Sequence, residues 1–184
     1  MKNRAYTVTI CVIAFMLIEL SSPQSLTAQS YKKLIKKTKS LIVVVDKDFD
    51  KTKTLSIGEI EKDNYSVVSA FRDELSFNSF ELISDQVSTS SINVDDEVKK
   101  GKSKTQIYKA LGISSDYYLS MTYTTGYTTL LDVYVSSVQG EIVDIENNGK
   151  IVCSFRYIAK RKSDISDIAE FIVSKINLGK NFRM

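Results

Sequence analysis

The chain has 184 residues and a formal net charge of +3, from 25 Lys and Arg against 22 Asp and Glu. This near balance argues against a nucleic-acid partner, because such proteins gather Lys and Arg on one face. Histidine is absent, which removes the commonest general base and metal ligand, and with it Ser-His and Cys-His nucleophiles. The sequence also lacks the G-x-S-x-G, P-loop and G-x-G-x-x-G motifs. We therefore expect a protein that is not an enzyme and needs no cofactor.

The first 29 residues have the organisation of a secretory signal peptide. Lys2 and Arg4 precede an apolar run at 8–20, and small and polar residues follow it. We expect cleavage after Ala28 or Gln29, which would place the mature chain in the periplasm or outside the cell, without a membrane span. The run is short for a span, which needs about 20 apolar residues, so a retained signal anchor is the alternative.

The two cysteines predict neither a lipid anchor nor an internal disulfide. Cys11 lies inside the apolar run, not after a small residue at its end, so it does not fit a lipoprotein acceptor. Cys153 would be the single cysteine of the mature chain. It is either a reactive thiol or a small buried side chain in a strand, and the strand pattern around it favours burial.

Residues 30–184 predict a single α/β domain. The basic segment 30–39 is either an arm that docks on a membrane or partner, or a solvated segment that packs Leu34 and Ile35 on the domain edge. Two apolar residues give little membrane affinity, which favours the second alternative. The apolar run 41–45 predicts a strand buried on both faces, as in a sheet covered by helices.

A helix and a short strand should follow, completing a β-α-β unit. Apolar residues recur at helical spacing, namely Ile57, Ile60, Val67, Val68, Phe71 and Leu75. The start of this helix is open, because 56–59 fits a capping box but Asn64 could cap a shorter helix. A strand at 80–83 would pair in parallel with the first strand through a right-handed crossover.

The polar segment 85–104 should contain a helical turn around 94–99. Residues 103–106 form a capping box, and the helix that follows should end at Gly112. Alternating side chains at 117–158 then predict an antiparallel meander. Its turns are expected at Thr125-Gly126 and at Asn147-Asn148-Gly149.

The last helix should begin at a Ser163 cap and end at Gly179, with the tail 180–184 frayed. Its apolar stripe is Ile165, Ile168, Ala169, Ile172, Val173 and Ile176. The element order is β-α-β-α-β-β-β-α. We therefore predict an α/β (α+β) fold with a single mixed sheet, whose antiparallel carboxy-terminal meander is covered by helices.

Two registers are possible for the second hairpin. A two-residue Asn148-Gly149 turn places Ile145 opposite Val152, whereas a turn with Gly149 left-handed in a bulge places Ile145 opposite Ile151. The bulged register collects the apolar side chains on one face, so we favour it, with Asn148 at negative φ. That face would hold Val143, Ile145, Ile151, Cys153 and Phe155, with Asp144 and Ser154 on the other.

Three local patterns match a known domain. They are a helix that runs into a short strand at 67–84, Leu111-Gly112 before a strand that opens at Asp116-Tyr117, and the hairpin 144–152, with one extra residue before its glycine. Together they resemble a periplasmic α/β domain shared by the curli-export channel protein, outer-membrane activators of peptidoglycan synthases and the amino-terminal domain of TolB. The resemblance implies a scaffold or interaction role without catalytic residues. Several members are lipoproteins, but this chain lacks the acceptor cysteine.

Carboxylates offer the remaining routes to metal binding or catalysis. Residues 46–50 read Asp-x-Asp-x-Asp, but Lys51 and Ile57 stand where a calcium loop needs glycine and a bidentate glutamate. We therefore expect no metal site. The pairs Asp95-Asp96 and Glu59-Glu61 could serve a hydrolase, but they lie in polar, surface-like segments.

A set of Tyr and Thr side chains gives the candidate partner surface, namely Tyr118, Thr122, Thr124, Tyr127 and Tyr134. Exposed tyrosines suit partner recognition, although strand propensity alone also favours Tyr and Thr. The leading hypothesis is an exported, non-catalytic domain of the cell envelope that binds another envelope protein or associates with itself. The alternatives are a small-ligand binding module and a carboxylate-dependent hydrolase.

The export hypothesis predicts a definite amino terminus for the mature protein. Amino-terminal sequencing of the exported form should start at Gln29 or Ser30. A membrane-bound product that keeps Met1 would show instead that the apolar run is a retained anchor.

Overall fold

The computed structural model describes residues 28–84 and 94–184, so nearly all of the expected signal peptide lies outside the described residues. One six-stranded sheet runs through the domain, in the order β2-β3-β4-β5-β1-β6. The strands are β1 (Thr38–Val45), β2 (Leu55–Ile57), β3 (Tyr117–Tyr127), β4 (Val133–Asp144), β5 (Lys150–Ala159) and β6 (Phe182–Arg183). The predicted single mixed sheet with an antiparallel β3-β4-β5 meander is confirmed.

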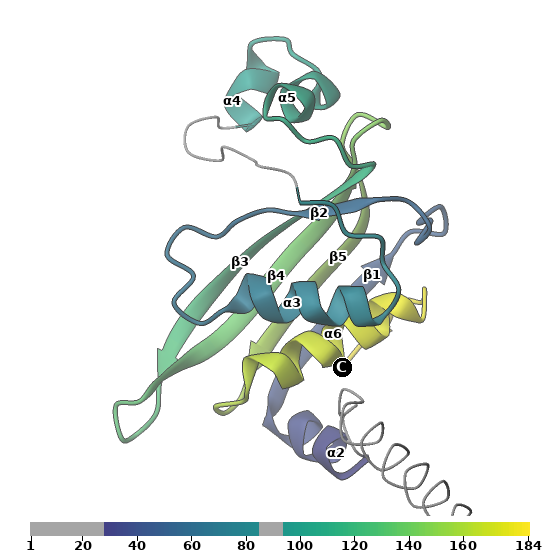
Figure 1. The fold of residues 1–184 in the computed structure, drawn as a ribbon. Helices are drawn as coiled ribbons and strands as arrows, with labels where there is room; N and C mark the ends of the chain where they lie inside the picture. Colours follow the sequence, from purple (N-terminus) through teal and green to yellow (C-terminus); the bar gives the residue numbers. More distant parts are fainter. Residues whose placement is uncertain (1–27, 85–93) are drawn as a thin grey trace, which may run out of the picture.

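Two helices cover one face of the sheet. These are α3 (Val67–Phe77) and α6 (Ile165–Asn177), which lie side by side across the strands (Figure 1). The helices α4 (Val94–Lys99) and α5 (Lys104–Ala110) lie at one end of the sheet, and α2 (Ala28–Lys37) lies at the other. The expected cleavage point after 28 or 29 therefore falls in the first turn of α2, and it stays a prediction.

The main core lies between the sheet and its two helices. Phe71 of α3 stacks on Phe155 of β5 with the ring centroids 5.3 Å apart, and Tyr31 of α2 meets Phe171 of α6 edge-on at 5.0 Å. Leu34 of α2 is buried in the same core, as predicted for the basic segment, but Ile35 is exposed and does not pack with it. Burial of each large apolar side chain contributes about 1.5–3 kcal/mol.

The first strand is covered on one face only, which corrects the prediction for 41–45. Leu41 and Val43 are buried beneath the helices, but Val44 points the other way and is 47% exposed. β-branched residues favour strands even where only one face of the sheet is buried, and this preference explains the apolar run. The apolar run therefore located the strand correctly but gave the wrong environment for its second face.

The β-α-β unit exists, but with a different first strand. Residues 55–57, which we expected at the start of a helix, form β2 and pair in parallel with β3. Leu82 makes a parallel bridge to Leu55, so the unit runs from β2 through α3 to 82. Neither predicted cap starts α3, because the Asp63 carboxylate accepts hydrogen bonds from the N–H groups of Val67 and Val68 at 3.0 and 2.8 Å.

The later helices agree closely with the sequence. The turn at 94–99 is α4, and the capping box of Ser103 and Gln106 starts α5. The cap of α6 is Asp164, one residue beyond the predicted Ser163, and its side chain accepts a hydrogen bond from the N–H of Ser166. Gly179 follows α6 at φ +62°.

The carboxy-terminal tail is ordered, so the prediction that it frays is wrong. Phe182 and Arg183 pair with β1 as β6, and Met184 exchanges backbone hydrogen bonds with Leu41 at 2.8 and 3.2 Å. The side-chain oxygen of Asn181 also accepts a hydrogen bond from the N–H of Val45. Without the tail, β1 would be an unpaired edge with open backbone groups, which explains why the tail adds to it.

The meander also departs from the predicted turns. The strand β3 continues to Tyr127, so the first turn lies at 128–132 and not at Thr125-Gly126. In the second hairpin, Ile142 pairs with Cys153 and Val143 pairs with Ile151, which leaves Val152 as the extra residue. Neither predicted register is correct.

A second apolar cluster explains the register. Val143 and Ile145 pack with Ile113 and Tyr118, apart from the main core, while Cys153 and Phe155 belong to the main core. Ile151 is exposed, so the five expected residues do not share one face. Cys153 is buried as predicted, and its burial raises the pKa of the thiol to about 12.

The turn of this hairpin generates a prediction. Asn148 and Gly149 both have positive φ, +53° and +68°, so the expectation of negative φ at Asn148 is wrong. The Asn148 side chain also accepts a hydrogen bond from the N–H of Lys104 at 3.0 Å. Asn148→Ala should therefore lower the free energy of unfolding by about 1–2 kcal/mol, measured by urea denaturation.

Gly149→Val should cost at least as much, because a Cβ there would lie 2.8 Å from the Lys104 side chain. Asn147→Ala is the matched control, since its side chain is exposed and its φ is not positive. Equal losses for Asn147→Ala and Asn148→Ala would contradict the turn geometry.

Candidate interaction surface

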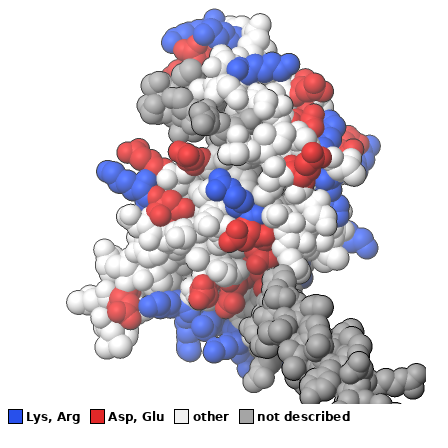
Figure 2. Space-filling view, viewed as in Figure 1, with Lys and Arg blue, Asp and Glu red and all other residues white. Residues whose placement is uncertain are grey.

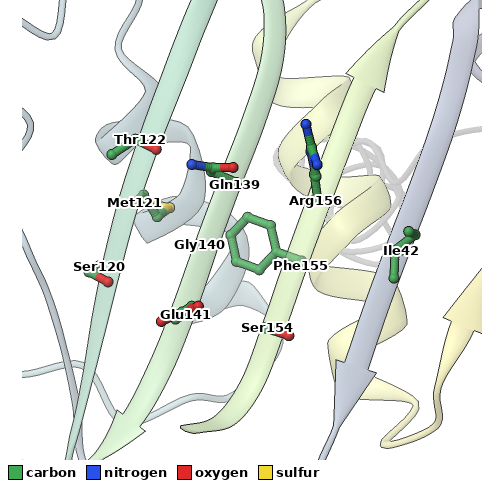
Figure 3. Close-up of a pocket in the computed structure, with 10 residues that line it drawn as sticks. All are labelled: Ile42, Ser120, Met121, Thr122, Gln139, Gly140, Glu141, Ser154, Phe155 and Arg156. Carbon is green, nitrogen blue, oxygen red and sulfur yellow. The ribbon is translucent and has the colours of Figure 1, made fainter.

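The sheet face opposite α3 and α6 is the candidate site. Its side chains alternate away from the main core along β3, β4 and β5, and the strand pairing sets them in rows. One row is Thr122, Gln139 and Arg156, and the next is Ser120, Glu141 and Ser154 (Figure 3). We call these six residues the open-face rows.

A hollow of about 480 Å³ lies along these rows. Ile42 of β1 lines one border, and backbone at Gly140 forms part of its floor. Antiparallel sheets can leave one face solvated, which explains the polar side chains. The hollow is therefore open and contains charged and hydroxyl side chains among its apolar groups, whereas sites that bind small molecules are usually enclosed.

The charged groups of the open-face rows have no intramolecular partner in the described ranges. Arg156 lies opposite Gln139, and Glu141 lies opposite Ser154, so the acid and the base are diagonal neighbours on adjacent strands. Within 28–84 and 94–184 neither side chain forms an ion pair or a hydrogen bond. Both are exposed and free to meet a partner's charges.

One end of this face is closed by α5. Tyr118 lies on the expected face but is only 9% exposed, packed with Val143 and with the ring of Tyr108 at 5.7 Å. Burial raises the pKa of the Tyr118 hydroxyl. Tyr118 is therefore part of the second cluster, and its expected place on a partner surface is wrong.

The other four predicted surface residues are dispersed. Thr122 and Thr124 are exposed on the open face, and the Thr124 hydroxyl contacts the hydroxyls of Ser136 and Ser137 at 3.0 and 2.7 Å. Tyr127 is exposed near the tip of the β3–β4 hairpin, while Tyr134 is half-buried against the main core. The structure brings only the two threonines together, and their role in binding stays a prediction.

Sequence reasoning missed most of the open-face rows. Gln139, Glu141 and Arg156 come from two strands, and only the correct pairing places them together. The favoured register put Val143 on the inner face, which would also have turned Glu141 inward. The outward direction of Ser154 was predicted correctly.

The acidic loop after β1 is held by lysine. The Lys150 ammonium lies 3.1 Å from an oxygen of Asp46 and 3.2 Å from one of Asp48. The pKa of Asp46 is lowered, first by the hydrogen bond from the Asp48 N–H and then by Lys150. Asp50 turns back to accept hydrogen bonds from Thr52.

The other carboxylates singled out in the sequence do not converge among the described side chains, outside which that of Asp95 lies. Asp96 pairs with Lys99 at 3.2 Å, and Glu59 and Glu61 are exposed. In the part of the chain that the structure describes, no three His, Cys, Asp or Glu side chains are arranged to hold a metal ion. None of the described helices is long and apolar enough to cross a membrane.

Comparison with known proteins gives no sequence family. No family model matches the chain, and no curated protein matches it significantly. Among solved structures it is similar to the PelC dodecamer from Paraburkholderia phytofirmans, with 14% identity and a TM-score of 0.44 over 76% of this chain and 94% of that one.

Two further structures are similar at the same distant level. A PDZ domain protein from Parabacteroides distasonis has 10% identity and a TM-score of 0.42 over 84% of this chain and 41% of its own. A minor lipoprotein from Acinetobacter baumannii has 14% identity and a TM-score of 0.34 over 72% of this chain and 98% of its own. Similarity this distant carries no information on partners or activity.

The acidic loop predicts that calcium will not stabilise the protein. Lys150 already neutralises Asp46 and Asp48, so millimolar calcium should leave the melting temperature unchanged. Lys150→Met is the comparison variant, because it removes the competing charge. A rise of several degrees in the unmodified protein would reveal a calcium site.

Proposed function

We propose that this protein is an exported, non-catalytic interaction domain of the cell envelope, and that it binds another protein through its open-face rows. The observation that supports this most directly is the pair Arg156 and Glu141, which are exposed on the sheet face that α3 and α6 leave open and have no partner among the described residues. Hydroxyl and amide side chains surround the pair. Such a surface offers hydrogen bonds and one charge of each sign to a protein partner.

The shape of the hollow favours a protein segment over a small molecule. Small-molecule sites bury most of the ligand and are lined mainly by apolar side chains. Here the hollow lies on an open sheet face, and six of its ten lining residues are polar or charged. A partner loop or strand could lie along the rows and pair with Arg156 and Glu141 at once.

A non-catalytic role fits the placement of the titratable groups. The carboxylates at 46–50, together with Asp116 and Asp144, are held by backbone N–H groups, hydroxyls or lysines. An active site needs a nucleophile, a base and an orienting group within reach of one reacting atom. These five aspartates are engaged in loop and turn contacts, so we assign them structural roles.

Charge reversal tests the proposal. Pull-down from envelope extract with Arg156→Glu should capture the partner at least about tenfold less well than the original protein, since a like-charge contact across an interface costs several kcal/mol. Arg72→Glu on the exposed side of α3 is the matched control and should capture the partner normally. Unchanged capture by Arg156→Glu and by Glu141→Lys would refute the open-face rows as the binding surface.

The same variants also test whether the protein associates with itself through this face. In a twofold dimer through this face, Arg156 of one copy would meet Glu141 of the other. Each single reversal would then dissociate the dimer, and the double variant Arg156→Glu, Glu141→Lys would restore it in a sizing experiment. With a different protein as partner, the double variant should remain defective.

A further inference from the structure

The tip of the β3–β4 hairpin exposes large apolar side chains. Tyr127, Leu130 and Leu131 are 70%, 84% and 80% exposed, and Val133 is also exposed. We call these four residues the apolar tip. Isolated exposed leucines are common on protein surfaces, but here four large side chains gather on one projecting hairpin (Figure 1).

The apolar tip is built in a definite conformation. The N–H of Thr128 donates to the carbonyl of Asp132, and the Thr128 hydroxyl accepts hydrogen bonds from Leu130 and Asp132. Leu131 has a φ of +63°, which is unfavourable for a residue with a Cβ. The turn therefore holds Leu130 and Leu131 outward even though the backbone at Leu131 is strained.

Basic side chains lie at the same end of the molecule as the tip. They come from α2, the start of β1 and the loop before α6, and they are Lys32, Lys33, Lys36, Lys37, Lys39, Lys160, Arg161 and Lys162. We call this set the basic rim. Acidic residues on these same segments and the adjoining turn of the hairpin are fewer, namely Asp132, Asp164 and Asp167.

Backbone and side-chain contacts join the rim to the tip. The N–H groups of Lys160 and Arg161 both donate to the carbonyl of Lys37, and Lys162 pairs with Asp132 in the hairpin turn at 3.8 Å. Figure 1 places the hairpin tip, the start of α6 and α2 at one end of the domain. Figure 2 shows Lys and Arg side chains gathered at that lower end.

We propose that this end of the molecule docks on an anionic lipid surface, with the apolar tip inserted among the lipids and the basic rim on the headgroups. Peripheral membrane proteins combine these two elements, because apolar insertion and attraction to anionic lipids add to each other. The rim residues lie on three separate segments at the end that carries the projecting tip, which suits a broad negative surface.

The position of the chain's first described residue agrees with this orientation. Ala28 begins α2 at the same end, directly after the segment that contains the apolar run 8–20. A chain that kept this segment would therefore meet the membrane at the end that carries the tip and rim. The open-face rows lie on the sheet face itself, so this site goes beyond the proposed function and does not depend on it.

A tryptophan reporter tests insertion, because the chain contains no tryptophan of its own. Leu130→Trp should shift its emission to shorter wavelength with vesicles of phosphatidylglycerol and phosphatidylcholine, and much less with phosphatidylcholine alone. Leu178→Trp is the matched control, since Leu178 is 65% exposed at the far end of α6 and should show no shift. The emission of this tryptophan depends only on its own surroundings. It therefore reports on the apolar tip whether or not the expected signal peptide is still attached.

Charge and strain variants complete the test. In the Leu130→Trp protein, we expect the triple change of Lys36, Lys160 and Arg161 to Gln to weaken vesicle binding. The lipid concentration that gives half of the emission shift should rise about a hundredfold. Neutralising three exposed lysines elsewhere, at 47, 109 and 180, should change it far less. In the original chain, Leu131→Asn should weaken vesicle co-sedimentation without loss of stability, because Asn tolerates positive φ.

Three results would overturn the proposal. They are a Leu130→Trp emission that no vesicle changes, a shift that is equal on neutral and anionic vesicles, and a dimer in solution that Leu130→Ser abolishes. The last result would assign the apolar tip to a second copy of the chain. Failure here would leave the charge-reversal result at Arg156 unaffected, so the two proposals fail separately.

Discussion

The absence of a side chain at Gly140 is the constraint on which the packing of this domain depends. A Cβ at this position would lie 2.5 Å from the Phe155 ring and 2.9 Å from the Met121 side chain, so only glycine lets both cross the middle of β4. The Phe155 ring is then free to stack on Phe71 of α3. Because this contact lies between the central strands and a helix, it sets how closely the helix layer approaches the sheet.

The opposite face does not depend on this glycine, because Gln139 and Glu141 alternate to the other side of β4. The open-face rows are held by the most extensively paired strands of the sheet, so their spacing is fixed before any partner arrives.

Periodicity in the sequence located most elements, but it could not assign every face. The stripe of α6 and the capping box of α5 depend on local rules, and both were predicted correctly. The β4–β5 register was predicted wrongly, because the neighbouring residues Ile142 and Val143 are both buried. They belong to separate apolar clusters on opposite faces of the sheet. When neighbouring residues are both buried, alternation no longer says which face is inside.

The candidate sites were hidden for related reasons. Arg156 and Glu141 become neighbours only through the register, and β2 is too short, at three residues, to leave a strand pattern. Leu131 and Val133 were predicted as an ordinary continuation of the meander, since apolar residues usually indicate burial. Their exposure follows from the length of the hairpin beyond the helix layer, which local sequence does not encode.

The register also decides how much of the sheet face remains open. It turns Val143 toward Tyr118, and this pair gives α5 its apolar contact with the sheet. Two hydrogen bonds fix the same attachment, from the Thr105 hydroxyl to the carbonyl of Ile145 and from the Lys104 N–H to Asn148. A one-residue slip would expose Val143 and release α5. The hairpin turn at 148–149 and the extent of the open-face rows are therefore coupled, although they lie at different places on the sheet.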